Sequence, residues 1–227
     1  MPDAPAMRAP DAPTLDALGG VPTLALMATS QEYGSALAAR LTPTLIGVGP
    51  VEAAVNATRA LAALERAGTL PALVLSIGSA GSNRLPQASV HRVASVSWRD
   101  IDASPFGFAR GTTPFLDLPA ERPLPELAPA LPAARLSTGA DVIPTPEAYA
   151  AIDADMVDME TFAVLRACDA WGVPLAGLRA VSDGDVAVTR YGDWADCLPL
   201  LDERLAGAVD ALAADLADGG LGRIGRA

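Results

Sequence analysis

Short apolar runs alternate with amphipathic, helix-like stretches along most of the chain. Helical spacing of apolar residues is seen at 30–41, 51–67, 147–152, 160–171 and from Leu198 to Leu216. The apolar runs that we expect to form strands are 23–27, 44–48, 72–77, 88–96, 134–137, 156–158 and 175–181. Such alternation is typical of βα units. The pattern therefore predicts an α/β fold, a single three-layer α/β/α domain with a central mixed, largely parallel sheet.

The segment between Pro50 and Gly68 shows how one of these helices is expected to lie. Proline is tolerated at a first helical position, and glycine commonly closes a helix. One side carries, at helical spacing, Val51, Val55, Leu61 and Ala62, whereas the polar side carries Glu52, Asn56, Arg59 and Arg66. We expect the side that carries the valines to pack against the sheet.

Two parts of the chain lack these patterns. Residues 1–20 are rich in Ala, Pro and Asp and end in two glycines, so we expect a poorly ordered leader before a domain that spans 21–227. An irregular stretch at 98–114 leads into a proline-rich run at 118–132, which is unsuited to the interior of a regular element. Long loops inside compact domains are more often functional or interfacial than decorative.

Composition and charge exclude several classes of protein. The 227 residues are 51% hydrophobic and 19% charged, which argues against a disordered chain. A formal net charge of -11 argues against binding to nucleic acid or to an anionic membrane surface. No apolar run approaches the roughly 20 residues that span a bilayer, and the first residues lack the pattern of a signal peptide. We therefore expect a cytoplasmic protein.

The chain has few residues suited to metal or triad chemistry. His91 is the single histidine, and the two cysteines, Cys168 and Cys197, do not have the spacing of metal ligands. Serine-type triads also need a histidine at the site. We expect no metal and no cofactor, and any catalysis must rest on carboxylates, hydroxyls and backbone groups.

The candidate site residues follow the apolar runs. In open α/β sheets, ligands bind at the carboxyl ends of the strands. Four such segments stand out in the sequence: ATSQEY at 28–33, GSAG at 78–81, VDMET at 157–161 and RAVSD at 179–183.

Each segment has a simple structural explanation when it is taken alone. Glu32 could complement the dipole of a helix in its first turn, and Asp183 could be a turn residue or a helix cap. Glu160 and Arg179 could form a structural ion pair.

In this order, GSAG, VDMETFAV and RAVSD resemble motifs of the nucleoside phosphorylase and nucleosidase superfamily, in particular of the methylthioadenosine/S-adenosylhomocysteine nucleosidases. The resemblance runs from about Thr23 to the C-terminal helix, and DIDASPFG at 100–107 is similar to the active-site loop of that family. It implies a homodimeric enzyme with a small nucleoside and water as substrates. The reaction implied is hydrolysis of the N-glycosidic bond between adenine and a 5-thioribose.

The resemblance also implies roles for two carboxyl groups. Asp183 would protonate, or hydrogen-bond to, purine N7 as the base leaves, and Glu32 would activate the attacking water. Many relatives carry a run of glutamates where this chain has ATSQEY. One carboxyl that protonates the leaving group and one that deprotonates water is the arrangement of inverting glycosidases. Each proton transfer is typically worth about 10²- to 10⁴-fold in rate.

The remaining roles concern the sugar, the base and the 5-substituent. Glu160 would accept hydrogen bonds from the ribose hydroxyls and stabilise the developing cation, with Arg179 as the cation that orients it. Met159 would pack under the sugar. The other implied pocket residues are Ser79, Ala80, Gly81, Ser182, Val142, Ile143 and Phe106.

Two of these positions have a particular interpretation. Val142 and Ile143 stand where relatives carry an aromatic residue that stacks on the purine, so aliphatic contact would replace stacking here. Phe106 would contribute to the thioalkyl pocket, whose wall comes from a neighbouring subunit in relatives.

The sequence also bears on the choice of nucleophile. Phosphorylases that resemble this fold carry an arginine two residues before the GS of the glycine turn, because a phosphate dianion needs cations. This chain has Ser76 there, and 28–34 contains no Lys or Arg, which favours water. The alternatives are a nucleosidase or phosphorylase for futalosine-type or ordinary purine nucleosides, a non-catalytic nucleoside-binding protein, or a structural domain whose turns match by chance.

Overall fold

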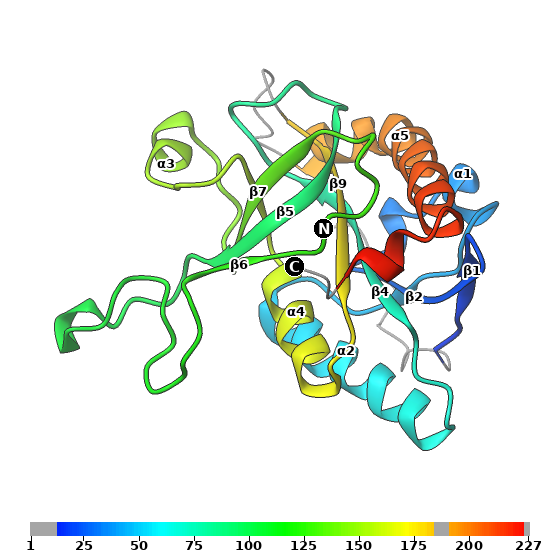
Figure 1. The fold of residues 1–227 in the computed structure, drawn as a ribbon. Coiled ribbons are helices and arrows are strands. Elements are labelled where there is room, and N and C mark those ends of the chain that lie inside the picture. The colour runs from blue at the N-terminus through cyan, green and yellow to red at the C-terminus, as the bar shows by residue number, and fades with distance from the viewer. Residues whose placement is uncertain (1–12, 184–190, 225–227) are drawn as a thin grey trace.

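A mixed nine-stranded sheet forms the centre of the molecule in the computed structural model, which describes residues 13–183 and 191–224 (Figure 1). The strands are β1 Asp16–Leu18, β2 Val21–Met27, β3 Thr44–Leu45, β4 Leu73–Ala80, β5 Val90–Trp98, β6 Glu121–Pro123, β7 Ala133–Thr138, β8 Met156–Asp158 and β9 Leu175–Val181. The α-helices are α1 Ser35–Ala38, α2 Pro50–Arg66, α3 Pro146–Ala150, α4 Thr161–Trp171 and α5 Tyr191–Ala217, and short 3-10 turns lie at Ser30–Glu32, Ser104–Phe106 and Gly220–Arg223.

The strand order is β1-β2-β4-β9-β5-β7-β8, with β3 beside β2 and β6 beside β5. Five pairs are parallel, namely β2/β3, β2/β4, β4/β9, β5/β7 and β7/β8. Three pairs are antiparallel, namely β1/β2, β5/β6 and β5/β9. The predicted mixed and largely parallel sheet is therefore confirmed.

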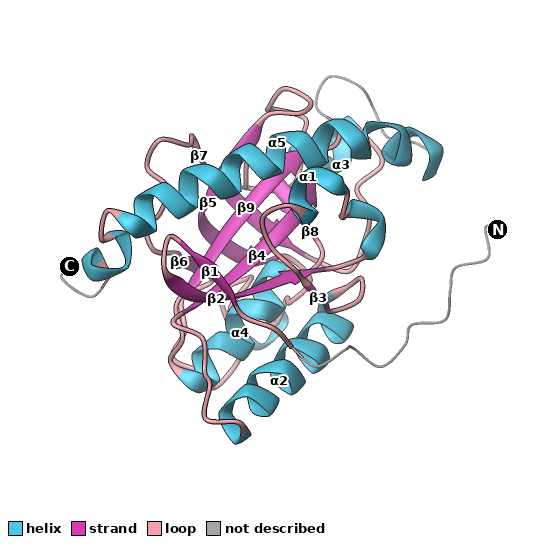
Figure 2. Cartoon of the chain, turned by 90° about the vertical axis from the view of Figure 1, so that its right-hand side faces the viewer, coloured by secondary structure: helices cyan, strands magenta, loops and turns pink. Residues whose placement is uncertain are grey.

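Helices cover both faces of this sheet (Figure 2). On one face, α2 and α4 pack on buried residues such as Leu26 and Val74. On the other face, α5 packs on Leu75 and Leu178. Burying two separate apolar layers in this way gives the three-layer α/β/α arrangement that the sequence predicts.

Order begins before residue 21, so the predicted start of the domain was wrong. β1 pairs with β2 in a hairpin whose two-residue turn is Gly19-Gly20, with φ values of 54° and 82°. Both turn positions of such a hairpin require positive φ, which glycine adopts without strain. The two glycines that marked the end of a leader are thus the turn of a hairpin, while residues 1–12 lie outside the described residues.

Helix α2 spans nearly the predicted range, but its predicted buried face was only partly right: Leu61 is buried, as predicted, and the valines are not. Val51 and Val55 are 73% and 50% exposed, whereas Asn56 is buried. The Asn56 amide donates to the carbonyl oxygen of Ile46 at 3.0 Å, which satisfies this polar group below the helix. Small residues such as Ala57, rather than the valines, face the sheet.

The helix predicted over residues 30–41 is replaced by a 3-10 turn and the short α1. The carboxylate of Asp202, on α5, accepts hydrogen bonds from the backbone N–H groups of Gly34, Ala36 and Leu37. A Cβ atom at Gly34 would lie 2.3 Å from this carboxylate. The distant aspartate therefore fixes a break in the helical pattern and places the preceding turn beside the end of β4.

The irregular stretch after β5 projects from the body of the molecule as a long excursion (Figure 1). Phe106 and Phe115 lie on it and are 85% and 94% exposed. The predicted proline-rich run contains the three-residue edge strand β6, which ends at Pro123. Within residues 13–183 and 191–224, no helix combines the length and apolar character that crossing a bilayer requires.

Candidate active site

A cavity of about 520 Å³ opens at the carboxyl ends of β2, β4 and β9, which run parallel to one another, and beside the end of β8, which runs in the opposite direction. It lies at the edge of the sheet where the strand-end motifs were predicted to meet. Glu32 and Asp183, which are far apart in the sequence, both line it. The other predicted site residues that line it are Ser79, Ala80, Gly81, Val142, Ile143, Met159, Glu160, Arg179 and Ser182.

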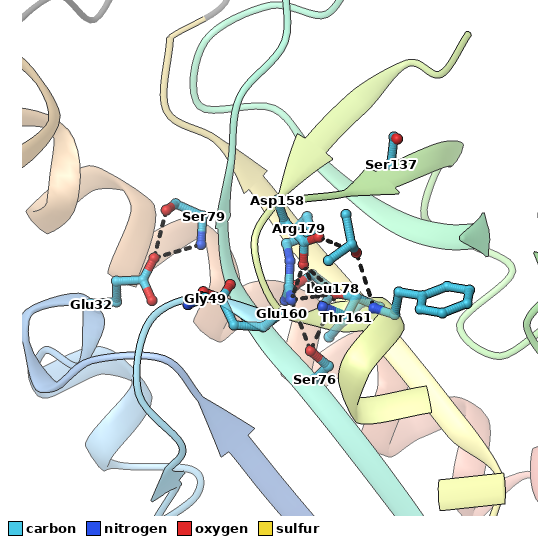
Figure 3. Close-up of polar contacts among 12 residues, drawn as sticks. Glu32, Gly49, Ser76, Ser79, Ser137, Asp158, Glu160, Thr161, Leu178 and Arg179 are labelled. Atoms are coloured by element: carbon cyan, nitrogen blue, oxygen red, sulfur yellow. Dashed lines mark hydrogen bonds and ion pairs between the residues drawn. The ribbon is translucent and has the colours of Figure 1, made fainter. Parts of the chain in front are cut away.

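Glu32 lies beside the carboxyl end of β4 and is bound there by Ser79. It is buried, and its Oε1 accepts hydrogen bonds from the Ser79 backbone N–H at 2.8 Å and from the Ser79 hydroxyl at 2.5 Å (Figure 3). The other oxygen, Oε2, would lie 3.0 Å from a Cβ atom at Gly78. Burial raises the pKa of Glu32, and the hydrogen bonds from Ser79 partly oppose this rise.

Asp183 is held just beyond β9, against Gly81, the residue that follows β4. Its Oδ1 accepts a hydrogen bond from the Ser82 backbone N–H at 2.6 Å, and its Oδ2 accepts one from the Tyr149 hydroxyl at 2.6 Å. A Cβ atom at Gly81 would lie 3.1 Å from Oδ2. Gly78 and Gly81 thus let two carboxyl groups approach the same strand end, one at each glycine.

Glu160 lies at the N-terminus of α4 and points toward the loop before α2. Its Oε1 accepts a hydrogen bond from the Gly49 backbone N–H at 2.9 Å (Figure 3). Gly49 has a φ of 95°, which favours glycine, so the backbone can present this N–H to the carboxylate. Burial and the neighbouring negative charge of Asp158 raise the pKa of Glu160 to about 7.

Arg179 forms its ion pair with Asp158, so the prediction that it orients Glu160 was wrong. The guanidinium Nη2 lies 2.9 Å from Asp158 Oδ2 and also donates to the hydroxyls of Ser76 and Thr161 (Figure 3). Although burial alone would raise it, the Arg179 charge holds the pKa of Asp158 below its usual value.

The course of the chain after β8 explains why Arg179 pairs with Asp158 and not with Glu160. The chain leaves the strand after Asp158, and Glu160 takes a φ of -131° and a ψ of -37°. It therefore does not continue the alternation of the strand, and its carboxylate turns toward Gly49 rather than toward the arginine. The Arg179 pair orders the motif around Asp158 and Thr161, and so fixes where α4 begins.

Phe106 is the one predicted site residue that does not line the cavity. It is exposed and belongs to the 3-10 turn Ser104–Phe106, in the excursion that projects from the body of the molecule (Figure 1). Within a single chain, the structure brings the other predicted residues together and leaves Phe106 apart.

Among the cavity-lining side chains that sequence reasoning missed, three make hydrogen bonds that bear on the site. Tyr149 reaches Asp183 from α3, and the indole N–H of Trp194, on α5, donates to the Ser79 hydroxyl at 3.2 Å. Arg99 donates to three backbone carbonyl oxygens, those of Ser137, Asp158 and Asp141. None of the three belongs to a motif that the sequence shows, because their partners lie far away along the chain.

Replacing Glu160 with glutamine should flatten the pH dependence of stability. The pKa of Glu160 is about 7 in the folded protein, against 4.5 for an ordinary glutamate, so the folded state binds a proton that the unfolded state releases. The free energy of unfolding should therefore fall, on the order of 3 kcal/mol, as the pH rises from about 4.5 to about 7, and stay lower above that. Urea unfolding of the wild type and of Glu160→Gln at pH 5 and pH 8 measures how much the free energy of unfolding of each protein changes with pH. Equal pH dependence in the two would show that Glu160 does not titrate in this window.

Part of the chain matches a known family, and its fold is shared by solved structures. Residues 137–214 match the Phosphorylase superfamily. A 5'-methylthioadenosine/S-adenosylhomocysteine nucleosidase of Actinobacillus succinogenes is 29% identical over 154 residues, which cover 60% of this chain and 65% of that relative. The match thus spans less than two thirds of the length of the relative.

Two solved structures share the fold. A futalosine hydrolase mutant of Helicobacter pylori superposes with a TM-score of 0.71 at 18% identity, covering 85% of this chain and 98% of the other. A 5'-methylthioadenosine/S-adenosyl homocysteine nucleosidase of Campylobacter jejuni gives a TM-score of 0.71 at 21% identity, covering 88% and 100%. The two differ in the substrate that their names give, so the fold alone does not choose between these substrates.

Proposed function

We propose that this chain is a purine nucleosidase of the phosphorylase superfamily, and that it hydrolyses the N-glycosidic bond of 5'-methylthioadenosine and S-adenosylhomocysteine. The products are adenine and a 5-thioribose. One observation carries this proposal: Glu32 and Asp183 line a single cavity, on either flank of the carboxyl end of β4. Hydrolysis with two carboxyl groups needs such an arrangement, with one group on the leaving base and the other on the water.

Asp183 acts on the leaving base. Departure of adenine leaves negative charge on the purine, which a proton delivered to N7 neutralises. The Ser82 backbone N–H fixes one carboxyl oxygen, and the other faces the cavity beside Tyr149. Asp183 is buried, so bulk water does not compete for the base at this point.

Glu32 acts on the attacking water. Ser79 fixes Oε1 by two hydrogen bonds, so the carboxylate has one orientation in the cavity. Because burial raises its pKa, Glu32 is a stronger base than an ordinary glutamate once it is ionised. Trp194, on α5, donates to the Ser79 hydroxyl and so supports this orientation.

Glu160 acts on the ribose. Its position between the Gly49 N–H and the cavity suits a carboxylate that accepts hydrogen bonds from the sugar hydroxyls. The ribosyl group becomes cationic as the base leaves, and a nearby carboxylate stabilises that charge. Met159, the neighbouring residue in the sequence, also lines the cavity.

Charge in the cavity favours water over phosphate as the nucleophile. Among the described residues that line it, the cations are Arg99 and Arg179. Arg179 is paired with Asp158, and Arg99 is bound to three carbonyl oxygens. A phosphate dianion needs cations that are available to it, and it would be repelled by the carboxylates of Glu32 and Glu160.

The assay that tests the proposal is release of free adenine from 5'-methylthioadenosine in phosphate-free buffer. We expect release at full rate without phosphate, followed by chromatography or by a coupled adenine assay. Product that forms only with added phosphate, as a ribose 1-phosphate, would make the chain a phosphorylase. Futalosine belongs in the same panel, because a futalosine hydrolase shares the fold at a TM-score of 0.71. Preferential cleavage of futalosine would instead identify futalosine as the substrate.

We also propose that the enzyme is a homodimer in which the excursion completes the neighbouring cavity. Phe106 and Phe115 are large apolar residues at 85% and 94% exposure, and Phe115 packs edge-on against Phe108 at 5.4 Å between ring centroids. Exposed aromatic clusters of this kind are typical of interfaces. Sedimentation equilibrium should give twice the mass of the chain, and a monomer at assay concentration would contradict the proposal.

A further inference from the structure

The hydroxyl of Tyr149 lies at the same end of the cavity as Asp183. It donates to Asp183 Oδ2 at 2.6 Å, and both residues line the cavity wall. Burial raises the pKa of Tyr149, and the hydrogen bond to Asp183 raises it further, so the phenol keeps its proton at neutral pH. A base that hydrogen-bonds to Asp183 therefore also comes within reach of a neutral hydroxyl.

Gly81 provides the space for this hydroxyl. A Cβ atom at Gly81 would lie only 2.1 Å from the Tyr149 oxygen and 3.1 Å from Asp183 Oδ2. Any other residue at position 81 would push the tyrosine away from the carboxylate. The end of β4 is thus shaped to hold Tyr149 and Asp183 together at one point of the wall.

The two groups differ in what they offer a purine. A protonated carboxyl has one donor, which the leaving base takes at N7, and its other oxygen only accepts. The Ser82 backbone N–H already occupies Oδ1 of Asp183. A hydroxyl can either donate or accept, depending on its rotation.

This difference matters at position 6 of the purine. A 6-aminopurine presents N–H donors beside N7, and a carboxyl oxygen or a hydroxyl can accept from them. A 6-oxopurine presents an acceptor there, which a carboxyl oxygen repels and only a donor satisfies. Among the groups that touch Asp183 here, the Tyr149 hydroxyl is a side chain that can supply this donor.

We propose that Tyr149 determines base specificity, and that its hydroxyl allows the site to cleave 6-oxopurine as well as 6-aminopurine nucleosides. This inference rests on the proposed function and deepens it. The hydroxyl donates to O6 of an oxopurine while Asp183 acts at N7, and it accepts from N6 of an aminopurine. Tyr149 thereby gives the aliphatic pocket of Val142 and Ile143 a polar contact with the base.

The experiment compares 5'-methylthioadenosine with 5'-methylthioinosine, which differ at position 6. The wild-type enzyme should cleave both. Tyr149→Phe should lower kcat/KM for the inosine compound by roughly 10- to 100-fold more than for the adenosine compound. A purely structural role for Tyr149 would lower both values together, so the ratio of the two constants is the informative measurement.

Tyr33→Phe is the matched control. Tyr33 is also partly buried, and its hydroxyl donates to the Leu41 carbonyl oxygen at 2.8 Å, outside the cavity. Removing that hydroxyl should leave the ratio of the two constants unchanged, and thermal unfolding of both variants checks the fold. Wild-type cleavage of the adenosine compound alone, or an equal loss with both substrates in Tyr149→Phe, would overturn the role of Tyr149 and leave the nucleosidase in place. Failure to cleave either nucleoside would overturn the proposed function as well.

Discussion

Replacing Asp183 with asparagine is expected to lower kcat for adenine release by about 100-fold or more. The amide has almost the shape of the carboxyl, so its oxygen can still accept from the Ser82 N–H, and its NH₂ can donate to the Tyr149 oxygen. It cannot deliver a proton to N7 of the leaving base. Steady-state kinetics with 5'-methylthioadenosine measures the loss, and thermal unfolding shows whether the fold is kept.

Asp155→Asn provides the comparison for this variant. The Asp155 carboxylate also accepts a backbone N–H, that of Arg135 at 2.8 Å, but it lies outside the cavity. We expect its kcat to stay close to that of the wild type. If Asp183→Asn turned over at the wild-type rate, Asp183 would have no part in the chemistry.

The strand-end motifs could be predicted from the sequence because they depend on local pattern. Runs such as 175–181 are almost entirely apolar because these strands are buried on both faces. The residue that follows a parallel strand then lies at the carboxyl edge of the sheet. Asp183 and Ser79 therefore fall at the cavity whatever the details of packing. The same reasoning holds for Glu32, which follows β2.

The partners of these residues could not be predicted, because they are set by packing between distant segments. Tyr149 reaches Asp183 from a five-residue helix, and Trp194 reaches Ser79 from α5. The Arg179 pair with Asp158 depends on the turn of the chain after β8, which the sequence motif does not reveal.

The buried face of α2 was predicted only in part for a related reason. Hydrophobic spacing at Val51 and Val55 favoured a buried side, yet the residues of α2 that are buried include three alanines beside Leu61. Asn56 can be buried because the Ile46 carbonyl oxygen accepts a hydrogen bond from its side-chain amide. Side-chain size and polar partners, rather than hydrophobicity alone, decided which face was buried.

Replacing Glu32 with glutamine is expected to lower kcat by about 10²- to 10⁴-fold while leaving base binding intact. The glutamine oxygen can take the place of Oε1 and accept from the Ser79 N–H and hydroxyl, so the turn should keep its position. Its amide nitrogen then faces the cavity, where the wild-type carboxylate would take a proton from water, and an amide is not a base. Single-turnover kinetics with 5'-methylthioadenosine measures the loss at the chemical step.

Calorimetric titration with adenine separates the roles of Glu32 and Asp183. Glu32 is held against Gly78 and acts on water, so Glu32→Gln should bind adenine as tightly as the wild type does. Asp183 is held against Gly81 and acts on the base, so Asp183→Asn should bind adenine more weakly, by roughly 10-fold, because the amide NH₂ takes the place of the carboxyl oxygen that can accept from the 6-amino group. Equal weakening of adenine binding in both variants would mean that the two carboxyl groups act on the same part of the substrate, and the division of the two proton transfers between them would then fail.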